Sequence, residues 1–303
     1  MDKTGIRERR DTPKLSVVVG SHNARDSVNE CLGALRKQGL QHGVEVIVID
    51  NSTDGTTEIL RRDFPDVELV EDSASSFIPQ LWETGIRRAT GDIVALTTAH
   101  CVPGEGWVEE ILKAHGADHP AIGGAIENEE SAGLVEWAIY FCRYSPYMLP
   151  FRETVVKEIP GDNASYQRWA LDKCQDVRRN GFWEPLVHAK LREEGYQLLM
   201  SPSIVVRHKR SFGLLGFIEQ RFHHGRRFGS DRAERCGMVQ RLVYIVMSPG
   251  IPLVYLWRIG KQVAKKRRHV AKLVLSLPVL SLFLLSWSAG ELLGYLKPVK
   301  RHW

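Results

Sequence analysis

The chain has 303 residues, of which 43% are hydrophobic and 25% charged, so it can form one large core or two smaller ones. Its five cysteines are odd in number and lack CxxC spacing, which argues against a disulfide framework and a structural zinc site. Residues 236–303 hold eleven Lys and Arg and one acid, so the net charge of +5 comes from this part. A basic, apolar tail on a mildly acidic body is typical of membrane association and excludes a nucleic-acid groove.

The N-terminal part of the chain predicts a strand, a helix and a second strand. Residues 1–13 are a polar tail without the apolar core of a signal peptide. The stretches 15–23 (LSVVVGSHN) and 46–56 (VIVIDNSTDGT) each begin with an apolar run and end in small and polar residues, as buried strands do. Because ligands of open α/β sheets bind beyond the carboxyl ends of the strands, residues 20–23 and 50–54 should rim one crevice.

The elements further along the chain alternate, which predicts an α/β fold with a mostly parallel central sheet flanked by helices. In chain order we expect a helix at 56–62, a strand at 67–70, a helix at 79–89, a strand at 93–96, a helix at 107–115, a strand at 121–127, an aromatic helix within 133–147, helices at about 166–174 and 184–194, and short strands at 198–200 and 204–207. The aromatic helix is more typical of core packing than of a sugar platform.

Two apolar segments lie near the C-terminus. Residues 270–296 are long enough to cross a bilayer, which takes about 20 apolar residues, although they contain one proline and one glutamate. Residues 242–259 are interrupted by an SPGIP stretch, which favours a re-entrant or interfacial hairpin. The basic stretch KQVAKKRRHVAK between them belongs on the cytoplasmic side. We therefore expect the tail to attach the protein to the cell inner membrane, with the body on the cytoplasmic side and the topology open.

The sequence DNSTDGT at 50–56 follows the second predicted strand. The segments that contain Thr98 to His100, Asp162 and Asn163, and Glu184 come after it in the chain. This order resembles the start of a family 2 glycosyltransferase with a GT-A fold, although Gly20 stands where the family often has proline. The resemblance covers roughly residues 14–230 and implies a nucleotide-sugar donor. It also implies a catalytic domain at 14–235, with a nucleotide-sugar half (14–130) and an acceptor half (131–235), followed by membrane-associated helices at 236–303. A generic nucleotide-binding α/β domain is the alternative.

The resemblance implies a set of donor-binding residues. Asp50 is placed near the base and ribose, and the full set for the nucleotide is Ser21, Asn23, Asp50, Ser52 and Asp92. Asp162 and Asn163 resemble the segment beside the donor sugar, although either could instead cap the following helix.

The fourth strand leads to the position of the family's Asp-x-Asp motif, which holds a divalent cation against the diphosphate. Here Thr98, Ala99 and His100 occupy that position. Neutral histidine can bind Mn²⁺ and less readily Mg²⁺, so either ion is a candidate cofactor. His208 lies where the family often has a histidine after its last core strand. One hypothesis is that His100 and His208 flank the diphosphate together, with or without a metal; the other is that His100 is only a polar residue at a strand end.

Residues 220–229 (QRFHHGRRFG) are basic and aromatic, and related enzymes place such a segment across the donor diphosphate. Arg226 could therefore contact phosphate in a bidentate manner. The equally weighted alternative is an interfacial helix that meets lipid headgroups.

The segment GFWEPLVH, followed by LREEGY, resembles the acceptor site of the family, where an acidic pair begins a helix. Glu184 matches the second acid, and Trp183 replaces the first. The resemblance makes Glu184 the general base, which takes the proton from an acceptor hydroxyl as that hydroxyl attacks the anomeric carbon. The alternative is a first-turn acid that is favoured by the helix dipole.

These features together are interpreted as an inverting glycosyltransferase that uses a nucleotide-sugar, UDP-linked rather than GDP-linked by family habit. Its acceptor would be a lipid-linked or cell-envelope glycan. A non-catalytic GT-A-like protein that binds a nucleotide-sugar or scaffolds an envelope complex is the main alternative, favoured by the missing acids at Thr98 and Ala99. A nucleotidylyltransferase would need a Gly-rich loop with Lys or Arg, which residues 20–23 do not provide.

Overall fold

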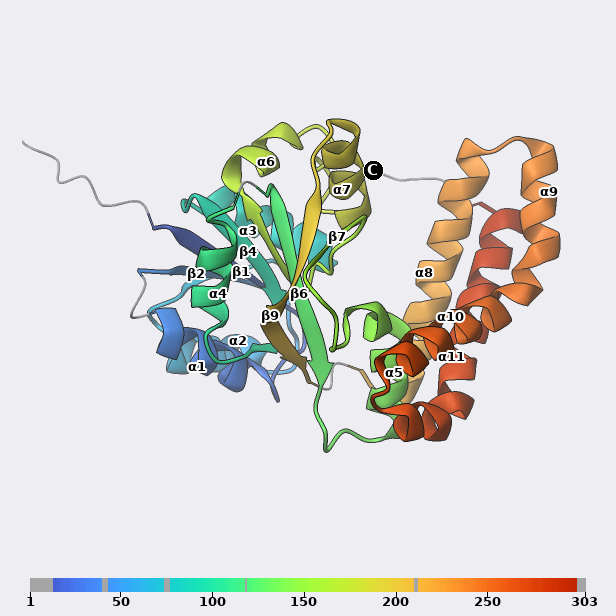
Figure 1. The fold of residues 1–303 in the computed structure, drawn as a ribbon, viewed down its shortest axis with the longest axis horizontal. Coiled ribbons are helices and arrows are strands. Elements are labelled where there is room, and N and C mark those ends of the chain that lie inside the picture. The colour runs from blue at the N-terminus through green and yellow to red at the C-terminus, as the bar shows by residue number, and fades with distance from the viewer. Residues whose placement is uncertain (1–12, 40–42, 74–76, 118, 210–211, 299–303) are drawn as a thin grey trace, which may run out of the picture. The chain divides into compact units, whose positions relative to one another are not determined.

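The computed structural model describes residues 13–39, 43–73, 77–117, 119–209 and 212–298 (Figure 1). The chain forms two compact units, each made of two segments. The first consists of Met1–Gly124 and Glu153–Val206, and the second of Ala125–Arg152 and Arg207–Trp303. The chain therefore passes between the units three times, and these crossings do not coincide with the predicted functional boundaries at 130 and 235.

The first unit opens with the predicted alternation of strands and helices. Its elements are β1 (Leu15–Ser21), α1 (Val28–Gly39), β2 (Glu45–Asp50), α2 (Thr56–Asp63), β3 (Glu68–Glu71), α3 (Ile78–Arg88) and β4 (Ile93–Thr98). The strands β3, β2, β1 and β4 lie side by side in that order and are parallel. Every residue of β1 is buried, which is why its sequence is a continuous apolar run.

Helix α3 packs closely on β1 and β2. A Cβ on Gly85 would overlap the Val18 side chain and crowd Ile49, so glycine is required at this contact. The connections through α1 and α2 cross the sheet in one direction, and the connection through α3 returns over β2 and β1. Because such crossovers are right-handed, α3 lies on the opposite face from α1 and α2 (Figure 1).

Beyond β4 the sheet also contains antiparallel pairs, so the sheet is mixed, with its parallel strands in the first part of the chain. Its elements are β5 (Cys101–Pro103), α4 (Trp107–Ala114), β6 (Ala121–Asn128), β7 (Thr154–Val156), β8 (Asn163–Gln167), α6 (Arg168–Lys173), α7 (Glu184–Glu193) and β9 (Leu198–His208). Strand β8 lies between β4 and β6 and is antiparallel to both. Two of the predicted short strands are one continuous strand, β9, and β5 and β7 have three residues each.

The second unit is mainly helical. Its helices are α5 (Leu134–Tyr144), η1 (Ser145–Tyr147), α8 (Leu214–Arg235), α9 (Met238–Met247), η2 (Ser248–Gly250), α10 (Ile251–Lys266) and α11 (Val270–Leu296). The aromatic side chains of α5 form core, as expected: Trp137 and Tyr140 are buried, and their ring centroids are 5.5 Å apart. Helix α11 packs against α5, α8, α9 and α10. The segments Met238–Lys266 and Val270–Leu296 are each long and apolar enough to cross a membrane.

Candidate functional site

Two loops at the carboxyl ends of β1 and β2, residues 21–27 and 50–57, are hydrogen-bonded to each other. The Asn23 amide donates to Ser52 Oγ at 2.8 Å, and Asn23 Oδ1 accepts from the Thr53 amide at 2.9 Å. Asn23 has a φ of 49°, in the left-handed region that asparagine tolerates better than most residues. The two loops therefore form a rim whose shape is fixed by the protein itself.

Asp50 lies at the base of this rim and is 1% exposed. Its Oδ1 accepts from Ser52 Oγ at 2.6 Å, and its Oδ2 accepts from Thr57 Oγ1 at 2.6 Å. A carboxylate has about four acceptor positions, so these two bonds orient the group without exhausting it. Ser21 is the register partner of Asp50, and its buried hydroxyl has no hydrogen-bond partner within the described part of the chain. Both residues can thus engage a polar ligand.

Asp54 holds the start of α2 and the first loop together. It accepts from the Thr56 hydroxyl and the Thr56 amide, and from the Arg25 amide at 3.2 Å. Partial burial opposes its charge, but these hydrogen bonds outweigh that effect and lower the pKa of Asp54 below its usual value. The carboxylate is therefore charged at neutral pH and stabilises the rim.

The end of β4 reaches the same rim, because Gly20 of β1 is the register partner of Thr98. Beyond Thr98, the ring of His100 lies against the first loop. Its Nε2 is 3.1 Å from the His22 carbonyl oxygen, and its Nδ1 is 3.3 Å from Ser27 Oγ. Since a carbonyl can only accept, Nε2 donates to it, while Nδ1 lies beside the Ser27 hydroxyl, which itself donates to the Ala24 carbonyl at 3.3 Å.

This geometry does not fit the metal site considered for His100. Both ring nitrogens already have protein partners. In the described ranges, no group of three or more His, Cys, Asp or Glu side chains could hold a metal ion. Thr98 and Ala99 add no carboxylate. Among the described residues, His100 is therefore not accompanied by the carboxylates that Mn²⁺ and Mg²⁺ prefer.

Glu184 begins α7 and is half-buried. Its carboxylate lies against the backbone of Gly161 and beside the ring of Trp82, since a Cβ on Gly161 would overlap both. The next residue, Asp162, accepts at its carbonyl from Thr97 Oγ1 at 3.0 Å, and the Trp82 indole donates to the Thr97 carbonyl at 2.7 Å. The Glu184 carboxylate is thus linked through Gly161 and Trp82 to the end of β4.

The segment around Glu184 is held firmly. The Phe182 amide donates to the Pro79 carbonyl at 2.7 Å, and the Phe182 ring lies edge-on to Tyr166 at 5.1 Å. One turn beyond Glu184, the buried His188 ring lies 2.9 Å from the Tyr166 hydroxyl and 2.6 Å from a carboxylate oxygen of Glu158. These contacts fix α7 and hence the position of its first residue.

Two donor-site predictions are wrong. Asn163 is 1% exposed, and its amide accepts from the Trp107 indole at 2.9 Å and donates to the Ile204 carbonyl at 3.0 Å. It joins β8 to α4 and β9 instead of facing a sugar. Asp92 directly precedes β4, whose first residue pairs with the first residue of β1, so it lies at the opposite edge of the sheet from the rim.

His208 and Arg226 belong to the second unit. His208 is 2% exposed, and its ring centroid lies 5.1 Å from that of Tyr144. Arg226 lies within α8, where its carbonyl accepts from Ser230 Oγ at 2.8 Å. The predicted contacts of these two residues with a diphosphate stay predictions.

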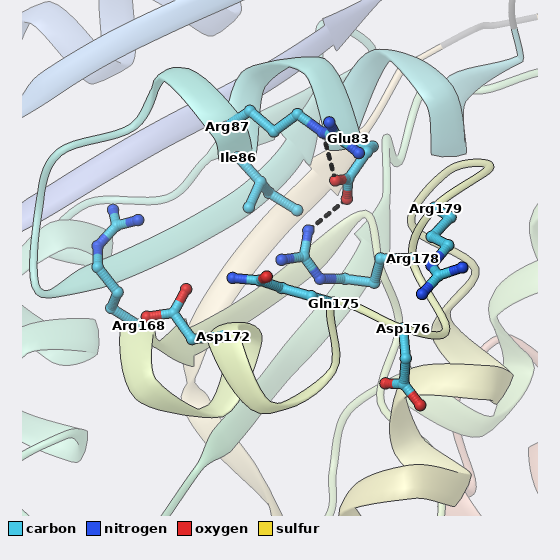
Figure 2. A pocket seen from close by; sticks show the side chains of 9 residues that line it. All are labelled: Glu83, Ile86, Arg87, Arg168, Asp172, Gln175, Asp176, Arg178 and Arg179. Carbon is cyan, nitrogen blue, oxygen red and sulfur yellow. Dashed lines mark hydrogen bonds and ion pairs between the residues drawn. The ribbon is translucent and has the colours of Figure 1, made fainter.

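A pocket of about 660 Å³ lies near the amino end of β4, where Arg168 Nε donates to the Gly91 carbonyl at 2.7 Å. Figure 2 shows that Arg87 and Arg178 both point to the carboxylate of Glu83 at its wall. The lining residues are Glu83, Ile86, Arg87, Arg168, Asp172, Gln175, Asp176, Arg178 and Arg179. Of its charged side chains, Arg87 and Arg178 pair with Glu83. The pocket is at the opposite edge of the sheet from the rim.

Sequence reasoning missed Trp82, Gly161 and His188. In the sequence, Trp82 looks like any apolar residue of an amphipathic helix. His188 looks like any polar residue of another helix. Gly161 gave the only usable signal, because a glycine directly before a polar segment often marks a close approach of the backbone to another group.

Comparison with known proteins shows the family to which the chain belongs. The family model for glycosyl transferase family 2 matches residues 16–174, which include both loops and the end of β4 but not Glu184. Glycosyltransferase AglE from Haloferax volcanii is 29% identical over 123 residues, 38% of this chain and 40% of that protein. The match therefore spans less than half the length of this curated relative.

The fold also resembles that of a solved mannosyltransferase. The mannosyltransferase PcManGT from Pyrobaculum calidifontis, solved with GDP-Man and Mn²⁺, matches with a TM-score of 0.56 and 19% identity, covering 93% of this chain and 87% of that chain. TarS 1–349 of S. aureus matches with a TM-score of 0.47 and 15% identity, covering 69% of this chain and 63% of that chain. With the family model matching more than half of its length, this chain belongs to glycosyl transferase family 2 and is a glycosyltransferase with a GT-A fold.

Proposed function

We propose that this protein is an inverting glycosyltransferase that moves a sugar from a nucleotide-sugar to a glycan or lipid-linked acceptor, with Glu184 as the general base. The observation that carries the proposal is the contact of the Glu184 carboxylate with the Gly161 backbone. Asp162, the neighbour of Gly161, is hydrogen-bonded to Thr97 near the end of β4. The end of β4 pairs with the end of β1, from which the first of the two proposed donor loops begins.

The reaction is a single displacement at the anomeric carbon. The acceptor oxygen forms a bond to that carbon while the bond between the carbon and the diphosphate oxygen breaks, and the electron pair leaves with the nucleoside diphosphate. Glu184 takes the proton of the acceptor hydroxyl, which makes the oxygen a better nucleophile. Its place in the first turn of α7 favours the charged carboxylate that this role needs.

The donor is assigned to the rim of the first unit. Asp50, Ser21 and Ser52 are proposed to bind the nucleoside, and Thr98 and Asp162 to face the diphosphate and the sugar. Family habit favours a UDP-sugar, and the solved relative that was determined with GDP-Man adds GDP-sugars as the second class to test.

The cofactor question follows from the same relative, which was solved with Mn²⁺. In this chain Thr98, Ala99 and His100 do not fit a divalent cation, because they supply no carboxylate and both nitrogens of His100 have protein partners. We therefore route no step through a metal and expect transfer to proceed without one.

The place of action is proposed to be the cytoplasmic side of the cell inner membrane. The apolar helices of the second unit support membrane association. The basic residues between them support the cytoplasmic side. A lipid-linked acceptor would be presented at that surface.

The proposal is tested by nucleoside diphosphate release. Detergent-purified protein is given UDP-sugars and GDP-sugars in turn, with and without a membrane lipid extract as the source of acceptor, and with EDTA or added Mn²⁺. We expect one donor to give release that depends on the acceptor and stays within a few-fold in EDTA. Absence of acceptor-dependent release with every donor would contradict the function. Loss in EDTA that Mn²⁺ restores would contradict the metal-free site.

The role of Asp50 is tested against Asp92, which the structure removes from the site. Asp50→Asn is expected to raise the Kd for the nucleoside diphosphate about 10- to 100-fold, because a hydrogen bond to a charged group contributes about 1.5–3 kcal/mol. Asp92→Asn should leave the Kd unchanged, since Asp92 precedes the far end of β4. Isothermal titration calorimetry measures both. An equal effect of the two substitutions would contradict the assignment.

A further inference from the structure

We propose that the second unit binds one leaflet of an anionic bilayer and does not cross it, although it contains two segments long enough to span. This inference deepens the membrane association of the proposed function. It rests on the close packing of α8, a charged helix, against α11, the most apolar helix.

Helices α8 and α11 meet backbone to backbone through four glycines. A Cβ on Gly225 or Gly229 of α8 would overlap the carbonyl oxygen of Trp287 or Glu291 in α11. The same holds in reverse, because a Cβ on Gly290 or Gly294 of α11 would overlap the carbonyl oxygens of Phe222 and Arg226. Such close approach of two helices is what small residues spaced by four permit.

The two helices run in the same direction over this contact, so neither could cross a membrane without the other. At one end the rings of Phe217 and Phe283 are 4.6 Å apart. At the other end Arg232 donates to the Tyr295 hydroxyl at 3.2 Å. The segment of α11 from Phe283 to Tyr295 is therefore accompanied by α8 along its whole length.

Helix α8 cannot lie in hydrocarbon. Its outer face is charged or polar on successive turns, with exposed side chains of Glu219, His223, Arg227, Glu234 and Arg235. A charged side chain that faces lipid near the centre of a bilayer is costly. The part of α11 beside α8 therefore cannot cross the hydrocarbon core. The rest of α11, residues 270–282, is about 20 Å long, which is short of the roughly 30 Å of a bilayer core.

Glu291 supports the same placement. This acid of α11 is 2% exposed, and its carboxylate accepts from the Trp287 indole at 2.9 Å and from the Tyr295 hydroxyl at 2.7 Å. Arg232 of α8 lies 3.8 Å away. The glutamate that interrupts the apolar sequence thus has partners from both helices, and its burial depends on α8 lying beside α11.

The other candidate span is interrupted. Helices α9 and α10 have 10 and 16 residues, and η2 separates them. Helix α9 runs back along the end of α11, where Arg241 donates to the Tyr295 carbonyl at 2.6 Å and the Ser288 hydroxyl donates to the Ser248 carbonyl at 2.6 Å. It therefore folds back beside the pair of α8 and α11 and does not extend that pair across a bilayer.

The surface that meets the bilayer, here called the apolar surface, consists of exposed large hydrophobic side chains of α9, α10 and α11. They are Met238, Val239, Leu242, Val243, Val246, Met247, Leu253, Val254, Trp257, Val270, Val274, Leu275, Leu282 and Leu285. Soluble proteins rarely expose so many together. Lys261 and Lys265 of α10 are exposed on the same helices and suit anionic headgroups.

The test measures on which side of a membrane each end of α11 lies. In a full-length chain in which Cys142 and Cys236 are replaced by serine, single cysteines are placed at Ala271, at Lys297 and, as a control, at Glu109. All three positions are exposed, and the remaining native cysteines are buried. Sealed inside-out vesicles are treated with a membrane-impermeant maleimide before and after lysis.

We expect all three cysteines to react equally before and after lysis. Reaction of Lys297→Cys only after lysis, while Ala271→Cys reacts before it, would show that α11 spans and would overturn the proposal. Recovery of the protein in the soluble fraction would overturn it as well. Neither readout depends on transferase activity, so failure of the proposed function is recognised separately.

A second experiment tests the apolar surface. Full-length protein is mixed with phosphatidylcholine vesicles that contain or lack phosphatidylglycerol, and the bound fraction is measured by flotation. The pair Met247→Glu and Leu253→Glu, at side chains 62% and 71% exposed, should lower the bound fraction at least tenfold. Leu215→Glu on α8, 78% exposed, should not change it. Equal loss in both variants, or no loss in the first, would overturn the assignment of the surface.

Discussion

Glu184→Gln is expected to lower kcat for sugar transfer by about 10²- to 10⁴-fold, the range that a positioned general base contributes. Glutamine has nearly the same shape as glutamate, so it keeps the contact with Gly161 and Trp82. It cannot take a proton from the acceptor hydroxyl. Because the donor loops lie on β1 and β2 and not on α7, the Kd for the nucleoside diphosphate should stay unchanged.

The measurement is single-turnover transfer under saturating donor, accompanied by calorimetric titration with the nucleoside diphosphate. Glu193→Gln is the matched control, since this exposed carboxylate lies at the other end of the same helix. It should retain the activity of the unchanged protein. A Glu184→Gln variant that keeps its kcat, or one that loses transfer only because donor binding fails, would contradict the assignment of the base.

The nucleotide half of the fold could be predicted from the sequence because its strands are buried on both faces. Such strands appear as unbroken apolar runs, and the polar residues that end them mark the carboxyl edge of the sheet. Asp50, Ser52 and Asn23 were predicted in this way, and Asn23 and Ser52 join the two predicted loops by a hydrogen bond. The helices α2, α3, α4 and α7 lie within two residues of their predicted bounds.

The errors concern residues whose surroundings come from distant parts of the chain. Asn163 has the composition of a sugar-binding segment, but its partners Trp107 and Ile204 are 56 and 41 residues away. Asp92 was predicted from the resemblance to the family, but it precedes β4. The register of β4 against β1 shows that this amino end of β4 lies at the edge of the sheet away from the donor loops. A polar residue next to a strand carries no local signal that distinguishes these cases.

The C-terminal part shows the same limit at the level of helices. From the sequence, GRRFG was interpreted as part of a basic segment and GELLG as the end of an apolar span. Their glycines contact each other's backbones across about 65 residues of chain, and this pairing could not be seen in either segment alone. The pairing explains why α8 belongs to the second unit. It also accounts for the single acid of α11, whose partners include Arg232.

Glu83→Ala is expected to lower the free energy of unfolding by about 3–5 kcal/mol, the cost of leaving one partner of a buried ion pair alone. Glu83 and Arg178 are 8% and 4% exposed, and the guanidinium of Arg178 donates to the Glu83 carboxylate (Figure 2). Arg178 also donates to the Leu171 carbonyl at 3.1 Å, which holds it in place. Without Glu83, its charge stays buried and uncompensated.

Two variants distinguish the free-energy cost of leaving Arg178 unpaired from the net contribution of the ion pair to stability. Arg87 also pairs with the Glu83 carboxylate, but the Arg87 side chain is 65% exposed. Arg87→Ala should therefore change the free energy of unfolding by only about 0–1 kcal/mol. The double variant Glu83→Leu with Arg178→Met should be more stable than Glu83→Ala, because no buried charge is left unpaired. Chemical unfolding followed by tryptophan fluorescence measures all three. If Glu83→Ala costs no more than Arg87→Ala, water must reach Arg178, and the ion pair does not anchor α3 to the turn that leads to Glu184.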